Sequence, residues 1–537
     1  MPQIGYAHRQ APMAREGMVA SCHPLASVAG VEVLKSGGNV VDAAIATNAV
    51  LGVTQPNYCG LGGDFFCLYY EATRGEAESR RVHFLNGAGR SGSRAGLKEL
   101  GRRGLAAVPP LGPGAVSVPG ATRAWSMLLE RFGTRPLKSL LAPAVHYAAD
   151  GFPLTLIVCQ AIRERSVLFD DPEWHRVFIP GGAFPDPGDI FRQPDLARTL
   201  GELGDDPDLF YRGRVGQAIA KRLERDGFLT ADDLAAHTGE WGEPISTTYR
   251  GYTVWETPPP TQGIATLLTL NLLEGFDVRA HPIHSVEHLH LLLEMTKLAY
   301  ADRDRWVADP AASRVPVEAL LDKAYAARRR ALFDPDKAQR YEAGEVDGDT
   351  TGFVIADGRG NLLSVIQSIY KGFGSGVVAP GTGVVLQNRG AYFNTNPEHP
   401  NCFGPRKQPF HTLIASIVTR DERPVLGLAN MGGDGQAMFH TQILTNALDF
   451  GVEIQEAIER PRFFMGRLDP SDAQDLVRLE SRVPVPVLHA LVGRGHNILP
   501  VSDWFTQEGQ AHAVAILKDG VLRGGADPRG DGAAVGY

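Results

Sequence analysis

The sequence predicts a mixed α/β protein of the α+β kind, and three observations support this class. Residues 27–52 and 197–309 carry apolar side chains largely at helical spacing. After residue 349, short apolar runs alternate with glycine turns, a pattern typical of strands. With 537 residues, 43% apolar and 21% charged, the chain has the composition of a globular protein and exceeds what one hydrophobic core serves. We therefore expect two lobes or one large layered domain.

The N-terminal part predicts two helices and a strand. The first helix ends at Gly37 and Gly38, and the second, which is rich in alanine, begins between Asn39 and Asp42. The turn at residues 60–63, GLGG, leads into an aromatic-rich strand. Because it lacks the Lys-Ser/Thr of a phosphate-binding P-loop and precedes a strand, this turn does not predict a nucleotide site.

The middle of the chain predicts mainly helices. Residues 109–120 are rich in turn formers, and we interpret them as a connection between lobes. Strand-like residues 249–263 interrupt the helical pattern, and residues 284–310 predict a long amphipathic helix. Its three histidines lack the H-E-x-x-H spacing and an evident third ligand, so they favour core or surface positions rather than a metal site: His284, His288 and His290.

Charge and cysteine content limit the partners. The net charge of -8 and the pI near 6.1 give no electrostatic reason to expect nucleic acid or an anionic membrane. Residues 1–21 lack the features of a signal peptide, so we expect a cytoplasmic protein. Five cysteines without C-x-x-C spacing argue against a disulfide framework or structural zinc: Cys22, Cys59, Cys67, Cys159 and Cys402. We expect no cofactor.

The clearest boundary of the sequence lies at Thr350, where a charged, loop-like stretch meets the first predicted strand. On its own, a threonine pair at this place is more often structural than catalytic. Six blocks, however, occur in order along almost the whole chain: GMVASCHPLASVAGVEVLKSGGNVVDAAIATNAVLGVTQP, GLGGDFF, LLLEMTKLAYADRDRWVADP, DTTGFVIADGRGN with FGSGVVAPGTGVVLQN, MGGDGQ and ADPRGDGAAVGY. Together they resemble the γ-glutamyltranspeptidase family of N-terminal-nucleophile hydrolases. The motifs LQNRGAYF and MGGDGQ resemble those of the family branch that includes oxamate amidohydrolases.

The resemblance implies a precursor that cuts its own chain between Asp349 and Thr350. The products would be a large subunit, residues 1–349, and a small subunit, residues 350–537, interlocked as a heterodimer in an αββα sandwich. The oligomeric state of this heterodimer is left open, because the family includes both single heterodimers and higher assemblies. Scission is chemically useful because a threonine hydroxyl is a weak nucleophile without a neighbouring base, and cleavage frees the α-amino group of Thr350 for that role.

The same resemblance assigns the remaining catalytic groups. Ser368 stands at the position of the hydroxyl residue that orients the nucleophile, and Thr351 lies beside it in the chain. The backbone amides of Gly432 and Gly433 would form the oxyanion hole, where glycine lets the backbone approach the substrate.

The sequence departs from the family at the pocket that reads a γ-glutamyl group. Leu85 stands at the place of the arginine that holds the α-carboxylate, and the nearest arginine is Arg90. The glutamine and the acidic residue that help bind the α-amino group correspond to Arg389 and Tyr392, which removes the family's anionic partner.

Three further replacements fall in the same pocket: Tyr370 for an asparagine, and His411 and Thr412 for a pair of serines. Arg389 could hold a substrate carboxylate through a bidentate contact. We infer an acyl group that bears an acid but not necessarily an α-amino group. The segment between Phe393 and Pro409 is also shorter than the stretch that carries the substrate-covering lid, which predicts an open site and favours hydrolysis over transfer.

Four hypotheses follow. The leading one is a self-cleaving threonine amidohydrolase for a small carboxylate-bearing amide such as oxamate. The alternatives are a γ-glutamyltransferase or glutathione hydrolase, a glutaryl or cephalosporin-type acylase, and an uncleaved, non-catalytic scaffold.

Overall fold

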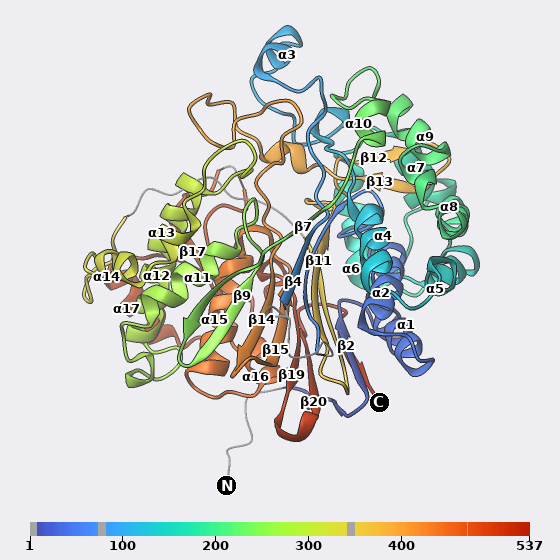
Figure 1. Cartoon of the computed structure of the whole chain (residues 1–537). Helices are drawn as coiled ribbons and strands as arrows, with labels where there is room; N and C mark the ends of the chain where they lie inside the picture. Colours follow the sequence, from blue (N-terminus) through green and yellow to red (C-terminus); the bar gives the residue numbers. More distant parts are fainter. Residues whose placement is uncertain (1–7, 73–81, 341–349, 470) are drawn as a thin grey trace.

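Two seven-stranded antiparallel sheets form the centre of the computed structural model, which describes residues 8–72, 82–340, 350–469 and 471–537 (Figure 1). The first sheet has the strand order β1 (Met13–Ala14), β20 (Leu522–Ala526), β19 (Ala511–Ile516), β15 (Arg423–Asn430), β14 (Ala415–Arg420), β9 (Tyr252–Glu256) and β8 (Ile245–Tyr249). The second has the order β21 (Ala533–Gly536), β2 (Gly17–Ser21), β10 (Thr351–Asp357), β11 (Leu362–Ser368), β3 (Asp64–Tyr70), β4 (Val82–Asn86) and β7 (Glu240–Gly242).

Helices cover the outer face of each sheet (Figure 1). Over the second sheet lie α1 (Pro24–Lys35), α2 (Val40–Thr54), α4 (Ala121–Phe132), α5 (Leu137–Asp150), α6 (Leu156–Ser166), α7 (Pro172–Phe178), α8 (Pro194–Asp205) and α9 (Arg214–Leu223). Over the first lie α11 (Gly263–Leu273), α12 (Val286–Trp306), α15 (Gln436–Leu448), α16 (Ile454–Glu459) and α17 (Val485–Gly493). Separate hydrophobic cores fill the two helix–sheet interfaces and the space between the sheets. The expected αββα sandwich is confirmed.

Smaller elements complete the chain. They are the helices α3 (Leu97–Arg102), α10 (Ala231–Ala235), α13 (Val317–Leu321) and α14 (Lys323–Arg330), the hairpin β12 (Val377–Ala379) and β13 (Val384–Leu386), the pair β5 (Phe152–Pro153) and β6 (Ile190–Phe191), and the three-stranded sheet β16 (Phe463–Met465), β17 (Leu476–Glu480) and β18 (Asn497–Val501).

Local sequence signals explain the element boundaries near the site. Helix α2 begins after Asn39, whose side chain accepts the amide N–H groups of Val41 and Asp42, while Asp42 accepts the N–H of Asn39 in return. This reciprocal capping box fixes the predicted helix start. After the turn at residues 60–63, strand β3 runs antiparallel to β11, which brings the N-terminal lobe into the same sheet as Thr350.

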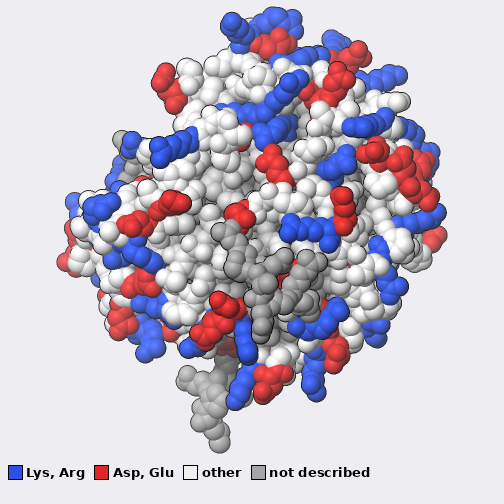
Figure 2. All heavy atoms as spheres, viewed as in Figure 1, with Lys and Arg blue, Asp and Glu red and all other residues white. Residues whose placement is uncertain are grey.

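The surface and the cysteines agree with the composition. Both signs of charge are interspersed on the face shown in Figure 2. All five cysteines are free thiols, four of them buried. Among the described residues, no helix is long and apolar enough to cross a membrane.

Candidate active site at the end of the inter-sheet core

Thr350 and Ser368 lie side by side at the end of the central strands. Thr350 is fully buried directly before β10, and its Oγ1 lies 3.5 Å from Oγ of Ser368, the last residue of β11. The backbone N–H of Tyr370 donates to the same Ser368 Oγ at 2.7 Å. The structure therefore brings the predicted nucleophile and its predicted orienting hydroxyl together, and a backbone donor holds that hydroxyl in place.

Thr351 faces away from this pair. Its Oγ1 lies 2.9 Å from Sγ of Cys22, and successive side chains of a strand point to opposite faces of the sheet. Thr351 therefore adjoins the nucleophile along the backbone, while its hydroxyl packs toward the helix layer.

The two glycines predicted for the oxyanion hole form a left-handed turn between β15 and α15. Gly432 has φ 118° and Gly433 has φ 54°, values that favour glycine. Among the described residues, no side chain caps the short helical turn that begins there, and the first N–H groups of a helical turn have no partner within the turn itself. The Gln262 side chain donates to the carbonyl oxygens of Gly433 and Thr412, both at 2.9 Å, and so holds the turn against residue 412.

A buried ion pair that was not predicted from the sequence supports this turn. Arg303, on α12, donates to Gln262 Oε1 at 2.7 Å and to Asp434 Oδ1 at 2.9 Å. Both charged side chains are almost completely buried. The sequence signal that could have pointed to this pair is that Arg303 lies inside the block LAYADRDRWVADP and Asp434 inside the block MGGDGQ.

Arg389 is a buried cation with spare hydrogen-bond donors. Its Nη1 donates to Thr412 Oγ1 at 3.0 Å, and the guanidinium lies 4.3 Å from the centre of the Tyr370 ring. Its Nε and Nη2, however, have no partner among the described residues. These two nitrogens form one edge of the guanidinium fork, the geometry that binds a carboxylate through two parallel hydrogen bonds.

Asp64 is a second buried charged residue of this region that the sequence alone did not single out. Its Oδ1 accepts the N–H of Gly89 at 2.9 Å and the Gln387 side chain at 3.0 Å, while its Oδ2 lies 3.7 Å from Nε2 of His411. Burial raises the pKa of Asp64 to about 7, against the lowering effects of Arg389 and the two donors. Burial and the charge of Arg389 hold the pKa of His411 well below its usual range. The signal was a charged residue in the otherwise apolar strand of the GLGGDFF block.

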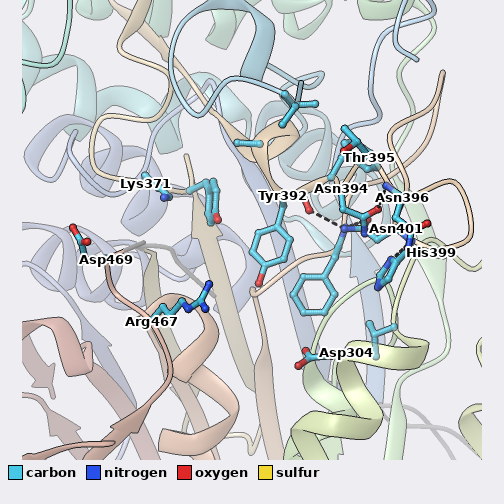
Figure 3. A pocket seen from close by; sticks show the side chains of 17 residues that line it. Asp304, Lys371, Tyr392, Asn394, Thr395, Asn396, His399, Asn401, Arg467 and Asp469 are labelled. Atoms are coloured by element: carbon cyan, nitrogen blue, oxygen red, sulfur yellow. Dashed lines mark hydrogen bonds between the residues drawn. The ribbon is translucent and has the colours of Figure 1, made fainter. Parts of the chain in front are cut away.

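An open hollow of about 700 Å³ adjoins this buried cluster, and Tyr370 and Tyr392 lie in its wall. Tyr392 donates to Asp434 Oδ1 at 2.6 Å, which links the hollow to the turn at Gly432 and Gly433. Figure 3 shows Tyr392 between Lys371 and Arg467 on one side and the loop from Asn394 to Asn401 on the other. Residues 394–401 of the shortened segment therefore form a side wall of the hollow.

Comparisons with known proteins place this geometry in a family. Residues 26–537 match the model of the γ-glutamyltranspeptidase family. The chain belongs to that family. It is 39% identical to the glutathione hydrolase-like YwrD proenzyme of Bacillus subtilis, over 97% of this chain and 98% of the relative. It is 34% identical to the oxamate amidohydrolase proenzyme of Klebsiella pneumoniae, over 97% of this chain and 98% of the relative.

The solved structures agree with this assignment. The crystal structure of cephalosporin acylase from Bacillus halodurans superposes with a TM-score of 0.92 and 37% identity, covering 100% of this chain and 99% of that one. As a γ-glutamyltranspeptidase family member, the chain is an enzyme of the N-terminal-nucleophile hydrolase class.

Two residues singled out from the family pattern stand apart from the cluster. The guanidinium of Arg90 is paired with Asp309 at 2.9 Å and with Glu240 at 2.8 Å, so the structure does not bring it together with Arg389. Leu85, at the place of the family's arginine, is buried in β4. Asp349 lies outside the described residues.

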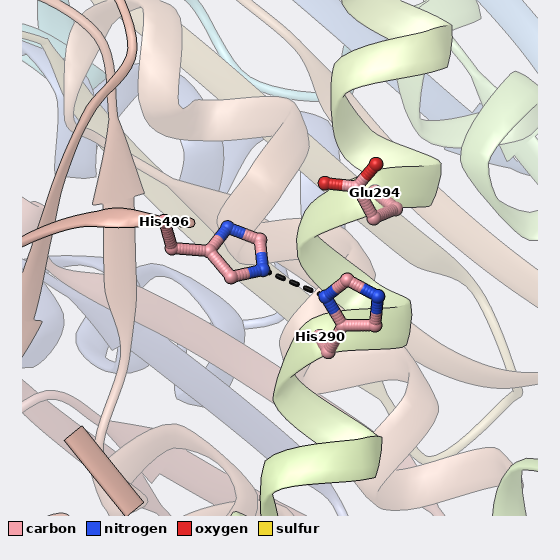
Figure 4. Close-up of side chains that lie close together, drawn as sticks. All are labelled: His290, Glu294 and His496. Atoms are coloured by element: carbon pink, nitrogen blue, oxygen red, sulfur yellow. Dashed lines mark hydrogen bonds between the residues drawn. The ribbon is translucent and has the colours of Figure 1, made fainter. Parts of the chain in front are cut away.

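One group of side chains in the described part of the chain has metal-ligand composition: His290, Glu294 and His496, whose ligand atoms all lie within 4.8 Å of one another (Figure 4). His284 and His288 do not belong to it. His290 Nδ1 lies 2.7 Å from His496 Nε2, and His290 Nε2 lies 2.8 Å from the carbonyl oxygen of Asp334. Lys297 Nζ lies 2.7 Å from Glu294 Oε1. Because an ammonium already neutralises the carboxylate and the rings bond to each other, this arrangement fits a structural network better than a metal centre.

Proposed function

We propose that the chain is a precursor that cleaves itself between Asp349 and Thr350 and then acts as a threonine amidohydrolase. Residues 1–349 and 350–537 would stay paired as a heterodimer. The substrate is a small amide whose acyl part carries a carboxylate, with oxamate as the smallest example. The observation that carries this proposal is Arg389, a buried cation whose Nε and Nη2 have no partner among the described residues. Arg389 contacts the ring of Tyr370, two residues after Ser368, and the hydroxyl of Thr412, whose carbonyl shares the Gln262 side chain with Gly433.

The geometry supports the following sequence of steps. Thr350 Oγ attacks the amide carbonyl, and the α-amino group that scission frees takes the hydroxyl proton. The N–H groups of Gly432 and Gly433 stabilise the oxyanion of the tetrahedral intermediate. Collapse of this intermediate breaks the C–N bond, and the leaving nitrogen takes up the proton. Water then attacks the Thr350 ester, which releases the acid and restores the hydroxyl.

The second candidate function is hydrolysis of an amide with a larger leaving group. The hollow of about 700 Å³ beside Tyr392 has room for one, and the likeness to the cephalosporin acylase of Bacillus halodurans supports a glutaryl or cephalosporin-type acylase. The similarity to the glutathione hydrolase-like relative supports a glutathione hydrolase as the remaining enzyme alternative.

Intact-mass analysis of wild type and Thr350→Ala is the first test. The wild type should give two fragments divided at the Asp349–Thr350 bond, and Thr350→Ala should stay one chain. Ammonia release is then measured with oxamate, glutaramate and the neutral diamide glutaramide, with glutathione hydrolysis and glutaryl-7-aminocephalosporanic acid as the tests of the alternatives. An uncut wild-type chain without activity would instead identify a non-catalytic scaffold.

A further inference from the structure

Asp434 directly follows the glycine turn (residues 432–433) and joins it to two other elements. Its carboxylate oxygen Oδ1 accepts hydrogen bonds from Arg303 Nη1 at 2.9 Å and from the Tyr392 hydroxyl at 2.6 Å. Its backbone carbonyl oxygen accepts another bond, from the Tyr300 hydroxyl at 2.5 Å. Because Asp434 is almost completely buried, protein groups rather than bulk water set the direction of its carboxylate.

Tyr392 is the donor that comes from the wall of the hollow. It lines the hollow of about 700 Å³, and its ring stacks on Phe410 with 4.8 Å between the ring centres. Burial of its hydroxyl group and the charge of Asp434 raise the pKa of Tyr392 well above its usual range. The phenol therefore stays protonated at neutral pH and can donate to Asp434.

The short helical turn η5 (Arg389–Tyr392) supports the glycine turn by two routes. Its last residue donates to Asp434. Its first residue donates to Thr412 Oγ1 at 3.0 Å, and the Gln262 side chain joins the carbonyl oxygens of Thr412 and Gly433. One short stretch of chain thus contacts the surroundings of both the predicted carboxylate contact and the predicted oxyanion donors.

We propose that Tyr392 is a positioning residue for the amidohydrolase reaction, which holds the glycine turn through Asp434 and does not bind the substrate with its hydroxyl. The proton that this hydroxyl could offer a substrate is already engaged at 2.6 Å. Without the bond, the carboxylate can rotate about its contact with Arg303, and the N–H groups of the glycine turn shift with it. This inference rests on the proposed function, because that function supplies the oxyanion hole.

Tyr392→Phe tests the proposal, because it removes the hydroxyl and keeps the ring that stacks on Phe410. For ammonia release from glutaramate, kcat should fall about 10- to 100-fold, since a misplacement of about 1 Å near the reacting atoms can cost 10²-fold. KM should stay within about threefold, because no contact with the bound substrate is removed. The matched control is Tyr249→Phe. Tyr249 is a completely buried tyrosine on the edge strand β8 whose hydroxyl donates to Asp449 at 2.6 Å, and its loss should leave kcat and KM unchanged.

Two ligands separate binding of the substrate from stabilisation of the transition state. Glutarate forms no tetrahedral adduct and should bind wild type and Tyr392→Phe equally in calorimetry. With 4-boronobutanoate, the Thr350 oxygen bonds to boron and its proton passes to the freed α-amino group, which leaves a tetrahedral boronate anion. The affinity of this anion should fall about 10- to 100-fold in Tyr392→Phe, in parallel with kcat. An equal loss for both ligands would mean that the hydroxyl binds the substrate, and the inference would be overturned.

Hydrogen exchange distinguishes this inference from the proposed function. It is measured in the Thr350→Ala background, where neither scission nor turnover is needed. The N–H of Gly435 donates to the carbonyl oxygen of Gly432 at 3.0 Å and reports on the turn. This N–H should exchange faster in Tyr392→Phe but not in Tyr249→Phe. If the wild type neither cleaves itself nor hydrolyses an amide, the proposed function fails, while faster exchange in Tyr392→Phe alone still supports its positioning role. Unchanged exchange, or a kcat of Tyr392→Phe equal to that of the wild type, overturns the inference.

Discussion

Replacing Arg389 by methionine should separate substrate recognition from stability. The substitution removes one hydrogen bond to Thr412 and the contact with the Tyr370 ring, together about 2–4 kcal/mol. It also removes a completely buried cation whose Nε and Nη2 have no partner among the described residues, and an unsatisfied buried nitrogen costs about 1–3 kcal/mol. These effects nearly cancel, so the free energy of unfolding should change by less than about 2 kcal/mol.

The effect on turnover should be much larger. A substrate carboxylate that loses a buried charged partner loses about 2–5 kcal/mol of binding. At about 1.4 kcal/mol per tenfold, kcat/KM for a carboxylate-bearing amide should fall between about 30-fold and several thousandfold. The neutral diamide glutaramide should lose little, so the preference for glutaramate over glutaramide should disappear. Arg389→Lys keeps the charge but not the planar fork and should recover part of the loss.

Two assays check this prediction. Ammonia release from glutaramate and glutaramide gives the preference, with intact mass to verify that each variant has cleaved itself. Unfolding by denaturant is measured in the Thr350→Ala background, where an intact chain avoids the dissociation of two subunits. The reasoning is refuted if Arg389→Met keeps the preference for the carboxylate, or if it loses more than about 3 kcal/mol of stability.

Three further outcomes are expected. Gly432→Ala should lower kcat about 10²- to 10³-fold in single-turnover assays. Alanine is strained at φ 118°, and its Cβ would lie 2.6 Å from the Phe439 ring, which would displace an oxyanion donor. Unchanged turnover would exclude this turn as the oxyanion hole. Arg303→Met should lower the free energy of unfolding by about 3–5 kcal/mol, because it leaves Asp434 buried without its cation; denaturant curves that coincide with those of the parent would contradict this. The pKa of Asp64 is raised to about 7, so its protonated form stabilises the fold below about pH 4, and this contribution, up to roughly 4 kcal/mol, is lost as the pH rises through 7. Asp64→Asn should therefore gain stability relative to the wild type over that pH range. Parallel stability–pH curves of the two proteins would refute the shift.

The sequence by itself determined the class of fold and the family, and it predicts Thr350 as the nucleophile. Glycine pairs and the capping residues Asn39 and Asp42 mark helix ends through interactions within four residues, and such signals can be read from a single chain. The change from helical to strand pattern at Thr350, with the ordered blocks around it, predicts the start of a central strand, and β10 begins at Thr351.

Only the tertiary structure decided which charges meet at the site. Asp64 and Arg389 are separated by more than 300 residues in the chain, and the register of β3 against β11 places Asp64 in the row of Ser368. The same holds for Arg303, on α12, and Asp434, in the turn after β15, which lie on opposite sides of the proposed scission point. Arg90, chosen because it lies near the family's arginine in sequence, is instead held by two carboxylates. Spacing along a strand determines which face of the sheet a side chain occupies, whereas the pairing of strands determines its neighbours. Strand pairing depends on residues far apart in the chain, so a local sequence pattern does not reveal it.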